Sequence, residues 1–234
     1  MCGFLESIRN PSFDILRSDG LPFAFVFSYF TGMKTFFLEG GAPAYGVLRE
    51  VADIILSGGV VIYPTDTIYG LGCDAFSKDA IQRVTRIKRR EDVKPFSFIC
   101  QDVAQISEFA FVSNWAYKLM NRLLPGPYTF ILEARKTNLP KKMVGRRNTV
   151  GVRIPDNAIC RKLVELTGRP LVTTSVNVSG DEPVEDLANI PQEHAGLIDA
   201  AISVGPLRSG PSTVVDLRGS APELIRQGEG AVVW

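Results

Sequence analysis

Residues 60–77 read VVIYPTDTIYGLGCDAFS, and this stretch indicates the class of fold. Its first residues, 60–63, are apolar and mostly β-branched, as in a buried strand. Pro64 ends that strand because proline cannot donate a ladder hydrogen bond. The Tyr-Gly-Leu-Gly segment that follows predicts a turn, and Ser77 is a typical N-cap for a helix. The hydroxyl-rich turn predicts that something small binds against this backbone.

Helices and strands alternate on both sides of this stretch. The expected helices have apolar faces within residues 47–55, 81–87, 112–124 and 157–167, and glycines 58, 59 and 168 end two of them. The expected strands cover residues 60–63, 96–100, 128–132, 149–154, 171–175, 201–204 and 213–217. Because the connection between residues 132 and 149 lacks a crossover helix, we expect one α/β domain with a mixed sheet.

Residues 1–32 differ from the rest of the chain. The segment FAFVFSYF at 23–30 is apolar, but acidic residues precede it and no small-residue cleavage site follows, so it does not fit a signal peptide. The segment MKTFFLEGG resembles a natural start at Met33. We therefore expect residues 1–32 to be an N-terminal extension, weakly ordered or packed as an appendage, and residues 33–234 to form the domain.

Composition excludes several classes of protein. The chain has 234 residues, 26 of them basic and 25 acidic, so its net charge does not indicate nucleic-acid binding. A mean hydropathy of +0.09 does not fit a membrane protein. The four cysteines lack metal-ligand spacing and His194 is the only histidine, which argues against a zinc site and a histidine-dependent hydrolase. We expect a cytoplasmic protein with reduced cysteines.

Two polar clusters follow expected elements. IKRREDVKPFS, at residues 87–97, places Lys88, Arg90 and Lys94 at a helix end, where they form a cationic site or a solvated terminus that opposes the helix dipole. TTSVNVSG, at 173–180, places Ser175 and Asn177 on one face of a strand that ends there. This second cluster is either a ligand site at the end of the strand or a polar turn.

Two further segments carry polar or basic residues. Thr129 in PGPYTFIL begins a strand, as a ligand contact or as a residue with good β-propensity. Residues 134–155 hold seven cations and no acid, which suits phosphate or RNA contact or a solvated loop. Neither GxxxxGK[ST] nor GxGxxG occurs. A nucleotide would therefore be held by scattered cations and by hydroxyls at strand ends.

Several segments occur together in one order, and together they resemble a known family. They are YPTDTIYGLGCDA, KRR with KPFSFI, PGPYTFIL, VGVRIPDN, TTSVNVSG, PSTVVDL and IRQGEG. Over residues 34–230 the chain resembles the YrdC-like threonylcarbamoyl-AMP synthases. The resemblance implies a twisted open mixed sheet with a positively charged concave groove. It also implies a nucleotidyltransferase that makes threonylcarbamoyl-AMP and pyrophosphate from L-threonine, bicarbonate and ATP with Mg²⁺, and downstream transferase proteins that use the product to modify tRNA.

The resemblance also assigns residues to the site. It implies catalytic roles for Lys88 and Arg90. The residues implied for L-threonine are Thr67, Ser175 and Ser212. Those implied for ATP are Lys88, Arg90, Lys94, Thr129, Ser175, Asn177 and Arg226. No protein-ligated metal is implied, and fixed cations would stabilise the charge that develops as pyrophosphate leaves. Gly70 and Gly72 would let the backbone turn close to the amino acid.

Three positions depart from the pattern of that family. Asp66 replaces a glutamate, Lys94 replaces an asparagine, and Ile99 falls about where a histidine that helps to bind threonine is found. These changes are closer to the YciO branch. One alternative is therefore a YciO-like paralogue that binds RNA, either tRNA or double-stranded RNA, without efficient synthase activity. Another is a different carbamoyl or nucleotidyl transfer on the same fold.

Overall fold

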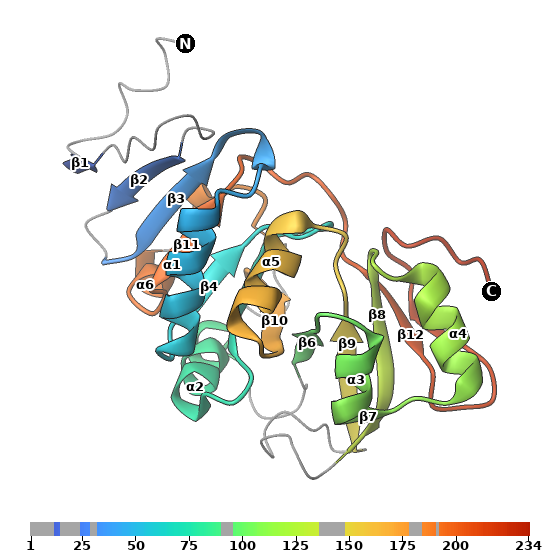
Figure 1. Ribbon diagram of the computed structural model, residues 1–234. Helices are drawn as coiled ribbons and strands as arrows, with labels where there is room; N and C mark the ends of the chain where they lie inside the picture. Colours follow the sequence, from blue (N-terminus) through green and yellow to red (C-terminus); the bar gives the residue numbers. More distant parts are fainter. Residues whose placement is uncertain are drawn as a thin grey trace.

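A computed structural model describes residues 12–14, 24–28, 32–89, 96–135, 148–177, 184–190 and 192–234. Within these ranges one 13-stranded mixed sheet forms the centre of the molecule, and helices pack against it (Figure 1). The sheet is open and twisted, with strand order β1-β2-β3-β11-β4-β5-β10-β6-β9-β8-β12-β13, and β7 pairs with β8. The predicted α/β class and mixed sheet are confirmed.

The strands are β1 (Ser12–Asp14), β2 (Ala24–Ser28), β3 (Lys34–Leu38), β4 (Val60–Tyr63), β5 (Gly70–Asp74), β6 (Ser97–Ile99), β7 (Ala110–Phe111), β8 (Tyr128–Ala134), β9 (Thr149–Arg153), β10 (Leu171–Ser175), β11 (Ala200–Ser203), β12 (Thr213–Asp216) and β13 (Glu223–Arg226). The helices are α1 (Tyr45–Leu56), α2 (Lys78–Ile87), α3 (Val103–Phe109), α4 (Asn114–Leu123), α5 (Ala158–Thr167) and α6 (Gln192–Ala195). Short 3₁₀ turns lie at Glu39–Gly41 and Leu187–Asn189.

Neighbouring strands come from distant parts of the sequence. β11 lies between β3 and β4 and runs parallel to both. β12 runs parallel to β8, whereas β10 is antiparallel to both β5 and β6. β1 and β2 extend the sheet beside β3, so part of the segment 1–32 pairs with the domain. The boundary at Met33 stays a prediction.

The predicted helix ends are confirmed where a cap marks them. The Ser77 side chain accepts a hydrogen bond from the Ala80 amide and begins α2. Asn157 begins α5 in the same way, and Gly168, at φ +62°, ends it in the left-handed conformation. α1 ends just before Gly58, whose φ is +87°.

The predicted glycine turn after Tyr69 is wrong, because residues 70–74 form β5 in the middle of the sheet. Tyr63, on the adjacent strand, is fully buried, and its ring lies across the two glycines. A Cβ atom at Gly70 would lie 2.8 Å from that ring, and one at Gly72 would lie 2.2 Å from the Val172 carbonyl oxygen. The glycines are therefore needed for close approach and not for a turn.

We expect Gly72→Ala to lower the free energy of unfolding by about 3 kcal/mol, because the new methyl group meets a strand backbone that cannot move aside. Gly46→Ala is the control, since nothing lies within 4 Å of a Cβ atom there and the residue lies inside α1. That change should stabilise by about 0.5–1 kcal/mol. Urea unfolding measures both values, and similar effects of the two substitutions would contradict the packing described for β5.

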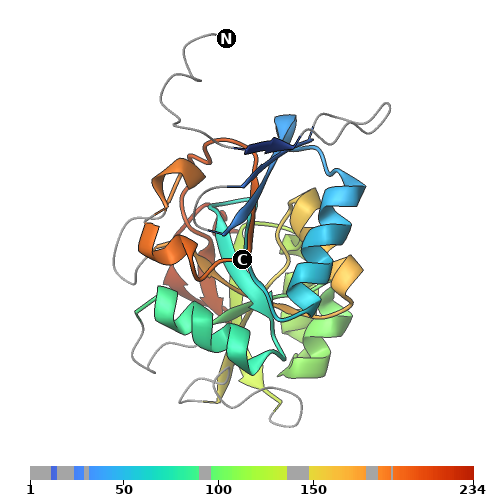
Figure 2. The same ribbon diagram turned by 90° about the vertical axis from the view of Figure 1, so that its left-hand side faces the viewer.

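Alternate side chains of the sheet enter two hydrophobic cores. Val60 and Ile62 belong to the larger core, which also contains residues of α2, α3 and α4. Val61 and Tyr63 belong to the other core, with residues of α1 and α5. α1 and α2 accordingly lie on opposite sides of β4 (Figure 2). Beyond α5, the face of the sheet that carries Tyr63 continues into a cavity.

Candidate functional site

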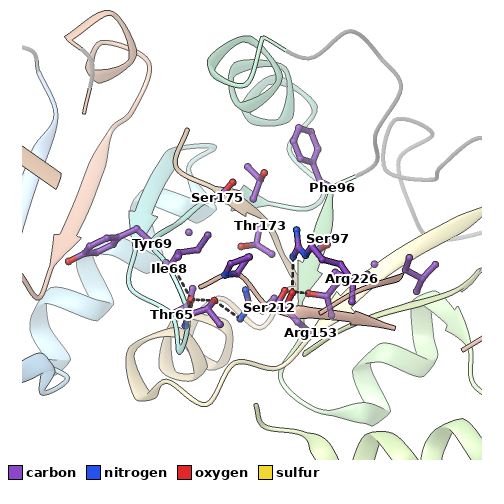
Figure 3. Close-up of a pocket in the computed structure, with 18 of the residues that line it drawn as sticks. Thr65, Ile68, Tyr69, Phe96, Ser97, Arg153, Thr173, Ser175, Ser212 and Arg226 are labelled. Carbon is purple, nitrogen blue, oxygen red and sulfur yellow. Dashed lines mark hydrogen bonds between the residues drawn. The ribbon is translucent and has the colours of Figure 1, made fainter. Parts of the chain in front are cut away.

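A cavity of about 280 Å³ opens over one face of the sheet (Figure 3). One row of paired residues crosses four strands beneath it: Thr173, Ser97, Gly151 and Ile131. The lining also includes residues of the turn after β4, of β12 and its approach, and of β13. A Cβ atom at Gly151 would lie 2.7 Å from the Ser97 hydroxyl oxygen, so glycine keeps the floor of the cavity open.

The period of the strands separates the cavity from the core. Thr129 and Ile131 of β8 face the cavity, whereas Phe130 between them is buried in the larger core. The expectation of a site at strand ends holds for Ser175, the last residue of β10, but the cavity extends over the middle of β8 and β9. Because β10 is antiparallel to both of its neighbours, its carboxyl end does not share an edge with theirs.

The structure brings together most of the residues that the sequence assigned to a site. Five of them line the cavity: Thr67, Thr129, Ser175, Ser212 and Arg226. Lys88 and Asn177 lie beside Ser175. Arg90 and Lys94 lie outside the described residues, as do the basic residues between 136 and 147. Ile99, at the position of the expected histidine, is fully buried in the core with α1 and α5.

Lys88 is the C-cap of α2, and it is only 1% exposed. Its Nζ atom donates hydrogen bonds to the Ser175 carbonyl oxygen at 2.9 Å, to Asn177 Oδ1 at 2.7 Å, and to the Asn177 carbonyl oxygen. The Ser175 hydroxyl in turn donates to Asn177 Oδ1. The alternative of a solvated helix terminus is therefore wrong for Lys88. Instead, its side chain holds the turn after β10 in place through these hydrogen bonds.

Hydrogen bonds to Thr65 determine whether the Thr67 hydroxyl donates or accepts. Thr65 Oγ1 donates its single proton to the Ile68 carbonyl oxygen at 2.6 Å and accepts from the Thr67 amide at 3.0 Å. The Thr67 hydroxyl, 3.0 Å from Thr65 Oγ1, must therefore donate to it. Since the proton of Thr67 is already used, this hydroxyl offers a ligand a lone pair, which suits a bound N–H group.

Arg153, the last residue of β9, is a cavity residue that the sequence did not single out. It is 7% exposed, and Nη2 donates to Asp66 Oδ1 at 2.7 Å and to Thr67 Oγ1 at 3.2 Å. Its Nε atom has no hydrogen-bond partner within the described ranges. Its place in the cavity could have been found from the alternation of side chains along a strand, because Thr149, Gly151 and Arg153 share one face of β9.

A second cation stands near Arg153. Arg226 Nη2 donates to the Ser212 carbonyl oxygen at 2.8 Å, and the Ser212 and Thr129 hydroxyls are 2.8 Å apart. Figure 3 shows both arginines close to Ser212. Burial, and then the positive charge of Arg153, lower the pKa of Arg226 below its usual value. Two neighbouring guanidinium groups in a partly buried cavity favour an anionic ligand.

Two further features bear on the kind of site. Among the described residues, no group of three or more His, Cys, Asp or Glu side chains is placed to hold a metal ion. Within the same ranges, no helix combines the length and apolar character needed to cross a membrane.

Comparison with known proteins identifies the class. A model of the Sua5/YciO/YrdC family, described as "Telomere recombination", matches residues 53–228. The chain belongs to this family, as the order of its sequence motifs predicted. The family includes proteins described as threonylcarbamoyl-AMP synthases.

Individual relatives resemble the chain over most of its length. YciO of Escherichia coli K12 is 36% identical over 199 residues, which are 84% of this chain and 96% of YciO. A putative threonylcarbamoyl-AMP synthase of Methanocaldococcus jannaschii is 37% identical over 183 residues, 78% of this chain and 86% of that protein.

Two solved structures share the fold. E. coli YciO superposes with a TM-score of 0.79 at 34% identity, covering 85% of this chain and 97% of YciO. Sua5 of P. abyssi complexed with L-threonine superposes with a TM-score of 0.77 at 31% identity, covering 83% of this chain and 57% of Sua5.

Proposed function

We propose that this protein is an L-threonylcarbamoyl-AMP synthase. The observation that carries the proposal is one cavity in which an acceptor hydroxyl, a buried guanidinium group and a second guanidinium group converge, beside a lysine-fixed Ser-Asn turn. An amino acid and a nucleotide together present the complementary groups. The L-threonine complex of the related Sua5 and the synthase description of the archaeal relative support the same assignment.

L-Threonine fits the part of the cavity beside the turn after β4. The Thr67 hydroxyl accepts from the substrate amine, because its own proton is used by Thr65. We place the substrate carboxylate against the guanidinium group of Arg153, which lines the same corner of the cavity, with 3.2 Å between Arg153 Nη2 and Thr67 Oγ1. A guanidinium group and an acceptor hydroxyl thus lie side by side, as the carboxylate and the amine do on the α-carbon of an amino acid.

ATP then occupies the rest of the cavity, between the turn after β10 and β13. Arg226, with the Thr129 and Ser212 hydroxyls, offers donors to its phosphates. Ser175 bounds the opposite side, with Asn177 hydrogen-bonded to it. The sequence predicts that Arg90 and Lys94 also bind the ATP phosphates. Mg²⁺ would enter with ATP as the Mg–ATP substrate.

The reaction joins three substrates in two bond-forming steps. The threonine nitrogen bonds to the carbon of bicarbonate, and water leaves, which gives a carbamate. A carbamate oxygen then bonds to the α-phosphorus of ATP, and the bond to the β-phosphate oxygen breaks with release of pyrophosphate. The protein contributes positioning and fixed cations, which oppose the negative charge on the leaving group. The product would serve tRNA modification by a downstream transferase.

Pyrophosphate release tests the proposal. Purified protein with ATP, bicarbonate and magnesium should release pyrophosphate only when L-threonine is present. Release that ignores threonine would indicate another carbamoyl or nucleotidyl transfer. No release and no threonine binding, with RNA affinity that falls steeply with salt, would instead support an RNA-binding paralogue.

Thr67→Val should weaken L-threonine binding about tenfold, because it removes one hydrogen-bond acceptor and keeps the volume of the side chain. ATP affinity should change little, since Arg226 is held by the Ser212 carbonyl oxygen and not by Thr67. Calorimetric titration with each ligand measures both affinities. An equal loss for the two ligands would contradict the role given to Thr67.

A further inference from the structure

Asp66 does not itself line the cavity, but it forms an ion pair with Arg153, which does. Its carboxylate is 8% exposed and bridges two elements: Oδ1 accepts from Arg153 Nη2 at 2.7 Å, and Oδ2 accepts from the Asp156 amide at 3.0 Å. The turn after β4 and the segment after β9 are therefore tied together at this residue.

We propose that Asp66 is a positioning residue for amino-acid recognition, which acts through the guanidinium group of Arg153. This inference rests on the proposed function for the identity of the ligand. An arginine side chain has several rotatable bonds, and a single contact does not fix its plane. Asp66 Oδ1 and Thr67 Oγ1 both accept hydrogen bonds from Nη2, and these two contacts fix the plane of the guanidinium group of Arg153, a residue that lines the cavity.

The orientation matters because the two ligand contacts are coupled. The Arg153 Nη2 atom that contacts Asp66 also contacts the Thr67 hydroxyl, and Thr65 fixes the direction of that hydroxyl. A rotation of the guanidinium group would therefore disturb the acceptor for the amine as well as the donor for the carboxylate. Asp66 in this way presets the spacing of a donor and an acceptor for an α-amino acid.

Whether Asp66→Asn weakens or strengthens L-threonine binding distinguishes a positioning role of Asp66 from a purely electrostatic one. If Asp66 acted only through its charge, Asp66→Asn would leave a more positive site and bind a carboxylate more tightly. If it positions Arg153, the same change should weaken L-threonine binding about 10- to 100-fold, as expected for a lost charged hydrogen bond. The ATP affinity should stay within about twofold, because Arg226 is held by Ser212 and not by Asp66.

The experiment titrates L-threonine, its analogue L-threoninol and ATP into the full-length wild-type chain and Asp66→Asn by calorimetry. L-Threoninol keeps the amine but lacks the carboxylate, so Asp66→Asn should reduce its affinity less than that of L-threonine. Asp66→Glu keeps the charge and should recover most of the L-threonine affinity. Equal losses for L-threonine and ATP would show a merely structural role and overturn the inference, as would unchanged or tighter L-threonine binding.

Asp74→Asn is a matched control within the same sheet. Asp74 is 4% exposed, pairs with Arg169 Nη1 at 2.6 Å and accepts from the Phe76 amide at 2.9 Å, but it does not line the cavity. This change should leave L-threonine affinity unaltered. Wild-type protein that binds L-threonine but releases no pyrophosphate would overturn the proposed function alone. Wild-type protein that does not bind L-threonine would overturn both proposals.

Discussion

Lys88→Met should reduce threonine-dependent pyrophosphate release at least about 100-fold while the protein remains folded. Lys88 holds the Ser175 carbonyl and both the carbonyl and the amide oxygen of Asn177, so one substitution releases the whole turn after β10. A lost charged hydrogen bond costs about 1.5–3 kcal/mol, and several are lost here. The steady-state rate of release measures the effect, with circular dichroism to verify the fold.

Two further variants make this expectation specific. Lys162→Met removes a lysine from an exposed pair with Glu165 on α5 and should leave the rate unchanged. Asn177→Ala should reduce the rate much as Lys88→Met does, and the double variant should lose little more, because both changes break the same unit. Additive losses, or a folded Lys88→Met protein with the wild-type rate, would contradict the role of Lys88 in holding the turn.

Arg153→Met should abolish L-threonine binding and also destabilise the protein by about 3–5 kcal/mol. The loss of stability comes from Asp66, whose 8% exposed carboxylate would be left without its ion-pair partner. The loss of binding comes from the missing guanidinium donor in the cavity. Chemical unfolding and calorimetric titration measure the two effects separately.

The double variant Arg153→Met/Asp66→Asn separates the two causes. Removing the second charge should recover most of the stability, because no unpaired ion remains in the interior. L-Threonine binding should not return, since neither new side chain donates to a carboxylate. Recovery of binding together with stability would show that Arg153 supports the fold and does not contact the substrate.

Much of the fold could be predicted because local signals mark its elements. β4 and β10 have the expected bounds, and Ser77 and Asn157 cap the helices that they were expected to begin. β5 could not be predicted in this way, because a glycine-rich strand has the composition of a turn. Its glycines are explained only by the buried ring of Tyr63 on the adjacent strand.

The candidate site was predictable in part. The motifs located Thr67, Ser175 and Ser212, which the structure brings to one cavity. Arg153 was not distinguished from other cations of the basic stretch, because its burial depends on pairing between β9, β8 and β6. The depth at which Lys88 is buried was equally invisible, since the packing of the end of α2 under the turn after β10 is a tertiary contact.

The interleaved order of the strands has a consequence during protein synthesis. β11 must insert between β3 and β4, and the cavity receives Ser212 and Arg226 from segments that a ribosome makes after β11. A nascent chain that still holds these residues in the exit tunnel therefore lacks one wall of the cavity. The cavity is therefore completed only after the segment up to Arg226 has left the exit tunnel, and until β11 and β12 have emerged the parallel pairing partners of β3, β4 and β8 are missing from the sheet.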